Sequence, residues 1–274
     1  MDITLEEFTL LRDFIYEKTG IYFEEKKAYF LNARIANRLA ETNSSNAKEY
    51  YRFLKYENSA DELKLLINLI TTNETYFFRD TEQMTSFADE ILPAVLEEKR
   101  KNNERTIRIW SAACSTGDEP YSIAILIRER MKSFENFNIE ILASDINTQV
   151  LKKCEEGIYT PRALKDTPKD ILNKYFNFDG KDYKIHDDVK KMITLKCINL
   201  IDSAQVRKIR NIDVLFCRNV LIYFDDNSKK QTVNDFYDVL SKDGFVLLGV
   251  GESLGRISAS FKLIRLKKII AYKK

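Results

Sequence analysis

The feature that most constrains the fold is an alternation of short apolar strands with amphipathic helices, which begins at residue 106. TIRIWSAA and FNIEILASD are predicted strands, and the helices EPYSIAILIRERMKSF and NTQVLKKCEEGIY follow them in turn. Farther along, IDVLFCRNVLIYF begins as a buried strand, SKKQTVNDFYDVLSKDG is a helix expected to end at Gly244, and FVLLGVGE is a strand. The closing FKLIRLKKIIAYKK is expected to complete a hairpin. This order predicts an α/β protein with a doubly wound parallel sheet.

Residues 1–70 show only helical periodicity. LEEFTLLRDFIYEKTG is expected to end at Gly20, and EKKAYFLNARIANRLAETN and NAKEYYRFLKYENS follow as amphipathic helices. In the second helix, Lys27, Arg34 and Arg38 fall on nearly one line beside an apolar face. This line is either a solvated face next to a core stripe or a docking surface for an acidic partner.

A different pattern separates the second and third predicted strands of the sheet. Residues 158–195 contain Pro161, Pro168, an Asp-Gly turn at 179–180 and apolar-polar alternation in KDYKI and MITLKC. We therefore expect a small β unit inserted into the larger domain.

Charge and rare residues exclude several classes of function. The 44 Lys and Arg residues against 42 Asp and Glu give a net charge of +2, which disfavours a nucleic-acid partner. The acidic start and the lack of a long apolar run predict a cytoplasmic chain without membrane insertion. The four cysteines form no C-x-x-C pair and His186 is the single histidine, so we expect neither a metal site nor a Ser-His-Asp triad.

Two strand ends carry residues suited to a nucleoside. In RIWSAACSTGDEPYS, Gly117 lies between a strand and a helix, and Asp118 and Glu119 would repel a phosphate. These acids alternatively complement the helix dipole. Asp145 ends the next strand, where a carboxylate binds the ribose hydroxyls, or it caps the following helix. A ribose site without a pyrophosphate cradle indicates S-adenosylmethionine.

The strand that begins IDVLFC leads to the same edge. Arg218 and Asn219 follow four apolar residues and are costly to bury unless paired, which favours a site. Tyr223 is either part of that site or a core aromatic. In the preceding INLID, Leu200 is placed to pack on an adenine ring and Asn199 to meet its edge.

TTNETYFFRD, WSAACSTGDEPYS, ILASDIN, FCRNVLIYF and GFVLLGVGESL occur in the order found in the CheR family, the chemotaxis receptor protein-glutamate O-methyltransferases. The chain resembles that family over nearly its whole length. The resemblance implies a class I S-adenosylmethionine-dependent methyltransferase fold. Such a fold is a Rossmann-like doubly wound sheet with a C-terminal antiparallel hairpin, here joined to an N-terminal all-α domain and a small inserted antiparallel β-subdomain.

The resemblance also implies the site residues. Arg79 and Tyr223 would be catalytic, with Arg79 orienting the attacking carboxylate. The expected cofactor-binding residues are Asn73, Thr75, Arg79, Glu119, Asp145, Asn199, Leu200, Asn219 and Val220. Lys27, Arg34 and Arg38 would contact acidic receptor helices. Phe77 and Phe78 are expected to pack the helical domain against the sheet.

The implied domains are a receptor-docking domain at 1–70, a linker at 71–90 that contributes to the cofactor site, and a methyltransferase domain at 91–274, with the β-subdomain at about 158–195. The implied activity is methylation of glutamates in methyl-accepting chemotaxis proteins by a monomer, with S-adenosylhomocysteine as product. Because NFDGKDYK is short, we expect independence from a receptor C-terminal pentapeptide tether. A non-catalytic S-adenosylmethionine-binding or receptor-docking module is the alternative.

Overall fold

The computed structural model describes residues 3–57, 59–130 and 136–274. Its N-terminal part is a helical bundle with its own apolar core. The helices are α1 (Leu5–Thr19), α2 (Ala28–Glu41), α3 (Ala47–Tyr56) and α4 (Ala60–Ile70), with a 3-10 turn at Glu25–Lys27 before α2. Gly20 ends α1 as predicted, because its φ of 71° suits glycine and its N–H donates to the Tyr16 carbonyl.

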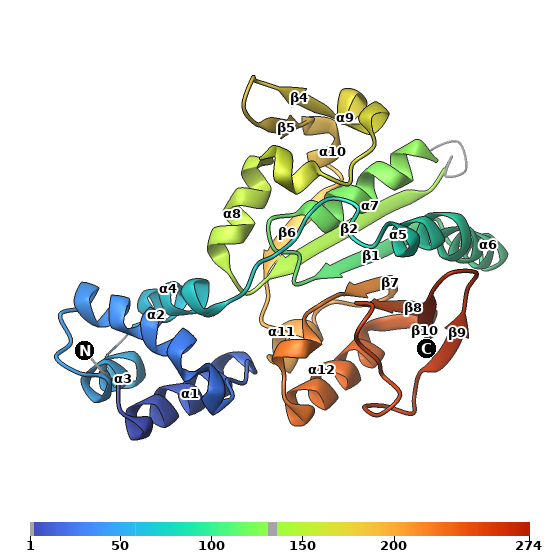
Figure 1. Ribbon diagram of the computed structural model, residues 1–274. Helices are drawn as coiled ribbons and strands as arrows, with labels where there is room; N and C mark the ends of the chain where they lie inside the picture. The colour runs from blue at the N-terminus through green and yellow to red at the C-terminus, as the bar shows by residue number, and fades with distance from the viewer. Residues whose placement is uncertain (1–2, 58, 131–135) are drawn as a thin grey trace.

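A seven-stranded sheet forms the centre of the remaining chain, in the order β6-β2-β1-β7-β8-β10-β9 (Figure 1). The strands are β1 (Thr106–Ala112), β2 (Asn138–Asp145), β6 (Ile193–Cys197), β7 (Ile212–Cys217), β8 (Leu240–Leu248), β9 (Lys262–Arg265) and β10 (Ile270–Lys273). The first five strands in this spatial order pair in parallel, and β10 is antiparallel to both neighbours. The predicted doubly wound sheet with a terminal hairpin is therefore confirmed.

Helices cover both faces of the sheet and enclose two apolar cores. One core includes side chains of α6 (Leu92–Lys101) and α7 (Asp118–Glu129), together with α5 (Thr81–Ser86) and the π-helical turn Phe87–Ile91. The other lies under α11 (Ser203–Val206) and α12 (Asp226–Val239). Helix α8 (Thr148–Glu156) follows β2. The residues 131–134, which the sequence assigns to the end of the α7 helix, lie outside the described residues.

The inserted unit is a three-stranded sheet in the order β3-β5-β4. It contains β3 (Ile158–Tyr159), a 3-10 turn (Pro161–Leu164), α9 (Lys169–Tyr175), β4 (Phe176–Phe178), β5 (Tyr183–Ile185) and α10 (Asp187–Lys190). The assignment of MITLKC to this unit is wrong, because β6 pairs in parallel with β2 at the edge of the main sheet. An edge strand is half-buried, so it shows the same alternation as a small antiparallel sheet.

The expected end of a helix at Gly244 is also wrong. Helix α12 ends at Val239, and Gly244 lies within β8. A Cβ atom at Gly244 would lie 2.8 Å from the carbonyl oxygen of Ile212, at the point where the β7–β8 register shifts. The glycine therefore permits close approach of two strands at an irregularity.

Phe77 and Phe78 do not join the helical domain to the sheet, contrary to expectation. Both belong to the core of the larger domain, where the Phe77 ring meets Tyr159 and Phe176 edge to face at centroid distances of 4.7 and 5.2 Å. The Phe78 N–H donates to the Ser122 hydroxyl (2.9 Å). The linker is thus anchored on the larger domain.

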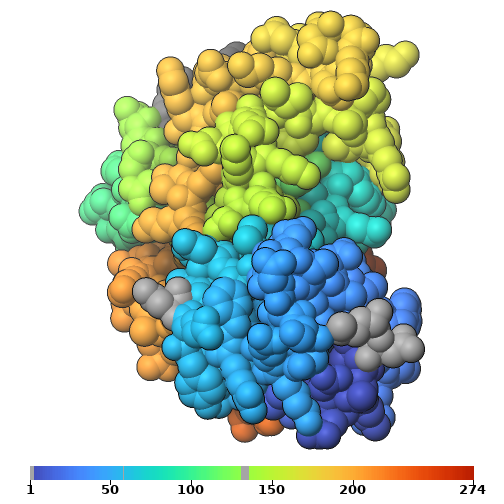
Figure 2. Space-filling model, turned by 90° about the vertical axis from the view of Figure 1, so that its left-hand side faces the viewer, coloured from blue at the N-terminus to red at the C-terminus, as the bar shows by residue number. Residues whose placement is uncertain are grey.

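Polar contacts and the apolar side chain of Ile21, which packs against both cores, join the helical domain to the larger domain. The Asn68 side chain exchanges hydrogen bonds with Thr148 at the start of α8, and Asn147 donates to the Asn68 carbonyl (3.1 Å). In Figure 2 the blue and cyan helices lie directly below the yellow-green segment that carries α8. Tyr16 donates to Asp225 (3.0 Å) at the start of α12. None of the helices in the described part of the chain has the length and apolarity needed to cross a bilayer.

Candidate functional site

A cavity of about 510 Å³ lies between the helical domain and the carboxyl ends of β1, β2, β6 and β7. The strand order reverses between β1 and β7, the position at which open α/β sheets bind ligands. All ten residues expected to be catalytic or to contact a cofactor line this one cavity: Asn73, Thr75, Arg79, Glu119, Asp145, Asn199, Leu200, Asn219, Val220 and Tyr223.

Asp145 lies at the carboxyl end of β2 and is only 6% exposed. Its two oxygens accept the N–H groups of Ser115 (2.9 Å) and Asn147 (2.8 Å). Burial raises the pKa of this carboxyl, and the backbone donors oppose that rise. Asn147, not Asp145, caps α8 with its side chain, so the carboxylate is available to the cavity.

The turn after β1 separates two neighbouring acids. Gly117 has a φ of 92°, and a Cβ atom there would lie 2.2 Å from the sulfur of Cys154. Asp118 does not line the cavity; it is 1% exposed, accepts a hydrogen bond from Thr116 (2.6 Å), and burial raises its pKa to about 6. Glu119 does line the cavity and accepts a hydrogen bond from Ser111 (2.7 Å).

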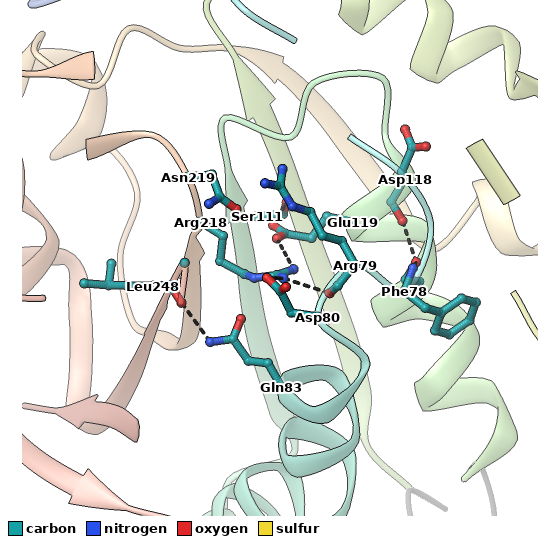
Figure 3. Close-up of polar contacts among 12 residues, drawn as sticks. Phe78, Arg79, Asp80, Gln83, Ser111, Asp118, Glu119, Arg218, Asn219 and Leu248 are labelled. Carbon is teal, nitrogen blue, oxygen red and sulfur yellow. Dashed lines mark hydrogen bonds and ion pairs between the residues drawn. The ribbon is translucent and has the colours of Figure 1, made fainter. Parts of the chain in front are cut away.

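Arg218 connects three parts of the cavity wall, as Figure 3 shows. Its guanidinium pairs with Glu119 (3.0 Å) and with Asp80 (2.6 Å), and it donates to the Arg79 carbonyl (2.7 Å). Its side chain is 2% exposed, so these charge-assisted bonds compensate its burial. The sequence prediction placed Arg218 at this edge of the sheet but did not include it among the site residues.

Among the described residues, no carboxylate forms an ion pair with the Arg79 guanidinium. Its guanidinium donates to the Glu74 carbonyl (3.1 Å) and lies 5.7 Å from the centroid of the Tyr76 ring. Glu119, another acid of the cavity wall, is already paired with Arg218. Figure 3 shows the Arg79 side chain extending on the same side of the site as Asn219. The wall therefore holds a guanidinium suited to an incoming anion.

The helical domain supports the far side of the cavity. Asn199 donates its side-chain N–H to the Lys18 carbonyl (2.7 Å), and the Tyr223 carbonyl accepts the Tyr22 N–H (2.9 Å). Leu200 is buried and turns its apolar surface to the cavity. Tyr223 lies partly exposed in the short 3-10 turn Leu221–Tyr223.

The three basic residues predicted to lie on one line of α2 differ in their exposure and in their partners. Lys27 is exposed at the cavity, whereas Arg34 is half-buried and donates to the Leu69 carbonyl (2.7 Å). The expected exposure of Arg38 is wrong: it is 6% exposed, paired with Glu62 (2.6 Å) and with Glu41. Glu62 comes from α4 and faces Arg38 only after the bundle packs, so helix periodicity gave no sign of it.

Comparison with known proteins gives matches to both parts of the chain. Residues 6–71 match the family model "CheR methyltransferase, all-alpha domain", and residues 73–270 match "CheR methyltransferase, SAM binding domain". The chain is 41% identical to chemotaxis protein methyltransferase 2 of Vibrio cholerae serotype O1, over 99% of this chain and 94% of that one. It is 36% identical to the chemotaxis protein methyltransferase of Borreliella burgdorferi, over 93% and 90% of the two chains.

Proposed function

The chain belongs to the CheR methyltransferase family, and on that premise we propose that it methylates glutamate side chains of methyl-accepting chemotaxis receptors. Membership of this family implies S-adenosylmethionine-dependent methyl transfer in chemotaxis. The glutamate acceptor, the glutamate methyl ester and S-adenosylhomocysteine products, and action as a cytoplasmic monomer are the proposed specifics.

The cavity fits S-adenosylmethionine by volume and by donor set. Its volume of about 510 Å³ lies within the roughly 300–1,000 Å³ typical of small-molecule sites. Each Asp145 oxygen accepts one N–H and retains acceptor capacity for a ribose hydroxyl. Among the described residues, the buried Asn219 Oδ1 has no hydrogen-bond partner, so it offers an acceptor to a ligand.

We assign the residues as follows. Asp145 would hold the ribose hydroxyls and Glu119 the amino-acid part of the cofactor. Asn199, Leu200, Asn219 and Val220 would flank the adenine and sulfonium side, and Asn73 and Thr75 would close the linker side. When bound, the cofactor supplies an electrophilic methyl group on a positively charged sulfur.

The protein's contribution to the chemistry is placement. A glutamate carboxylate is ionised at neutral pH and needs no strong general base, which agrees with a chain holding one histidine. Well-oriented reactants supply roughly 7 to 11 kcal/mol of a barrier. Arg79 would orient the acceptor carboxylate through charge-assisted hydrogen bonds, and Tyr223 would form a second hydrogen-bonding wall that excludes water.

The observation that carries this proposal is that, among the described residues, Arg79 lines the cavity without an ion-pair partner. Two of the four acids that line the cavity, Glu119 and Asp145, are satisfied by Arg218 and by backbone N–H groups. Lys27 and Arg218 also line the cavity, but Arg218 is paired with Asp80 and Glu119 and Lys27 belongs to the helical domain. Arg79 is therefore the linker cation that can receive a substrate carboxylate.

Methyl transfer to purified receptor tests the proposal. Tritiated cofactor should label the receptor, and mild base should release the label as methanol, because methyl esters are base-labile. Arg79→Ala should abolish most of this label at saturating cofactor and receptor. Arg128→Ala is the matched control, since Arg128 pairs with Asp188 away from the cavity. Wild-type turnover by Arg79→Ala would contradict the assignment, and a wild-type chain that binds without releasing label would be the non-catalytic module.

We also propose recognition of the receptor through the exposed Lys27 and the partly buried Arg34, against acidic receptor helices. Tether independence is supported by the β4–β5 turn. Asp179 closes that turn by accepting the N–H groups of Lys181 (2.9 Å) and Asp182 (2.8 Å), which leaves a short, tight connection.

A further inference from the structure

We infer that Glu252 is a positioning residue that fixes the loop after β7, and through it the cofactor-facing atoms of Asn219 and Val220. Glu252 does not line the cavity and nothing in the predicted site includes it. This inference rests on the proposed function only in taking S-adenosylmethionine as the ligand of the cavity. It does not depend on a glutamate being the methyl acceptor.

The Glu252 carboxylate accepts N–H groups from two chain segments. One oxygen accepts from Asn219 (2.7 Å) and from Gly249 (2.8 Å), and the other accepts from Val220 (3.0 Å) and Ile222 (3.3 Å). These donors belong to the ends of neighbouring strands β7 and β8. One side chain therefore satisfies backbone groups that neither strand can pair.

The loop it holds has an unfavourable backbone. Asn219 has a φ of 59°, in the left-handed region, which asparagine adopts more readily than other non-glycine residues but which is still less favourable than a right-handed or extended backbone. Only a single 3-10 turn, Leu221–Tyr223, follows it. Such a conformation persists where surrounding contacts impose it, and the bonds to Glu252 are contacts of that kind.

Gly249 makes the close approach sterically feasible. A Cβ atom at that position would lie 2.8 Å from the Asn219 side-chain nitrogen and from a Glu252 oxygen, and 2.9 Å from the Asn219 main-chain nitrogen. The Glu252 N–H donates back to the Gly249 carbonyl (2.9 Å) and closes the turn. Gly249 and Glu252 together hold the end of β8 against the loop.

Glu252→Gln tests this arrangement because it keeps the shape of the side chain. An amide presents an NH₂ group to two of the N–H donors, so the loop should relax away from its position. We expect the Kd for S-adenosylhomocysteine, measured by calorimetry well below the unfolding midpoint, to rise about tenfold, or about 1.4 kcal/mol. Gly249→Ala should give a similar rise. The double variant should have a Kd for S-adenosylhomocysteine no higher than that of the single variant with the higher Kd, because both changes displace the same loop.

Glu90→Gln is the matched control, since Glu90 accepts the Lys267 N–H (3.2 Å) away from the cavity and should leave the Kd unchanged. A lower Tm with an unchanged Kd in Glu252→Gln would overturn the inference, as would losses that multiply in the double variant. If Glu252→Gln does not fold, an unchanged Kd in Gly249→Ala overturns it. A wild-type protein that binds S-adenosylhomocysteine yet forms no base-labile ester would contradict the proposed acceptor and leave this inference standing.

Discussion

Asp118 should make the protein less stable as pH rises from 4 to 6, and Asp118→Asn should remove that loss. The carboxyl is 1% exposed, and burial raises its pKa from 3.8 to about 6 against the opposing bond from Thr116. Between these values the unfolded chain is ionised at this position while the folded chain holds a proton. The unfolded state therefore binds fewer protons, and the free energy of unfolding falls with rising pH.

The magnitude follows from the two pKa values. They differ by about 2.2, and at 1.36 kcal/mol for each pKa unit the loss is about 3 kcal/mol when complete. An asparagine is neutral throughout this range and its carbonyl oxygen can still accept the Thr116 hydroxyl. Relative to wild type, the variant should gain about 2.4 kcal/mol between pH 4 and pH 7, because more than half of the unfolded chains are already ionised at pH 4. A constant difference in stability between the two proteins does not affect this value.

Urea unfolding of both proteins at several pH values measures this difference. The single tryptophan, Trp110, is fully buried and reports unfolding by its fluorescence. Asp225→Asn is the control of opposite sign. Burial raises the pKa of Asp225, but hydrogen bonds from Ser228 and Tyr16 outweigh it and leave the pKa lowered. That variant should therefore lose stability relative to wild type as pH rises. Parallel pH curves for Asp118→Asn and wild type would refute the reasoning.

Three further changes test other parts of the structure. Glu62→Ala leaves the buried Arg38 and the Tyr50 hydroxyl without their shared carboxylate, and should cost about 3–5 kcal/mol in urea unfolding. Gly117→Ala places a Cβ 2.2 Å from the Cys154 sulfur at a φ of 92°; it should weaken S-adenosylhomocysteine binding in calorimetry and cost about 1–3 kcal/mol of stability. Lys27→Glu should raise the KM for receptor severalfold in initial-rate measurements, whereas removal of the receptor's C-terminal pentapeptide should leave the initial methylation rate unchanged.

Strand ends were the most informative part of the sequence. Asp145 and Asn219 each come at the end of an apolar run, and parallel strands bring such ends to one edge, so sequence alone predicted that they would meet. Contacts between elements far apart in the sequence could not be predicted in this way. Arg38 and Glu62 look like two ordinary surface charges until α2 and α4 pack together.

Short elements were the hardest to assign. The alternation in MITLKC is the same for a small antiparallel sheet and for the half-buried parallel edge strand β6. Gly244 resembles a helix cap in sequence, yet a strand irregularity uses the same freedom from a Cβ atom. Phe77 and Phe78 were expected to pack the helical domain against the sheet, but both join the core of the larger domain, where Phe77 meets aromatic rings of the inserted unit.

The separate core of the helical domain has an evolutionary consequence. The helices of residues 5–70 enclose their own core, and the joining surface includes amide and hydroxyl pairs such as Asn68 with Thr148. Mutations on the outer face of the helices can therefore accumulate without repacking the sheet. Under the proposed function, the part of the protein that reads its receptor is free to diverge with that receptor while the methyl-transfer chamber is inherited intact.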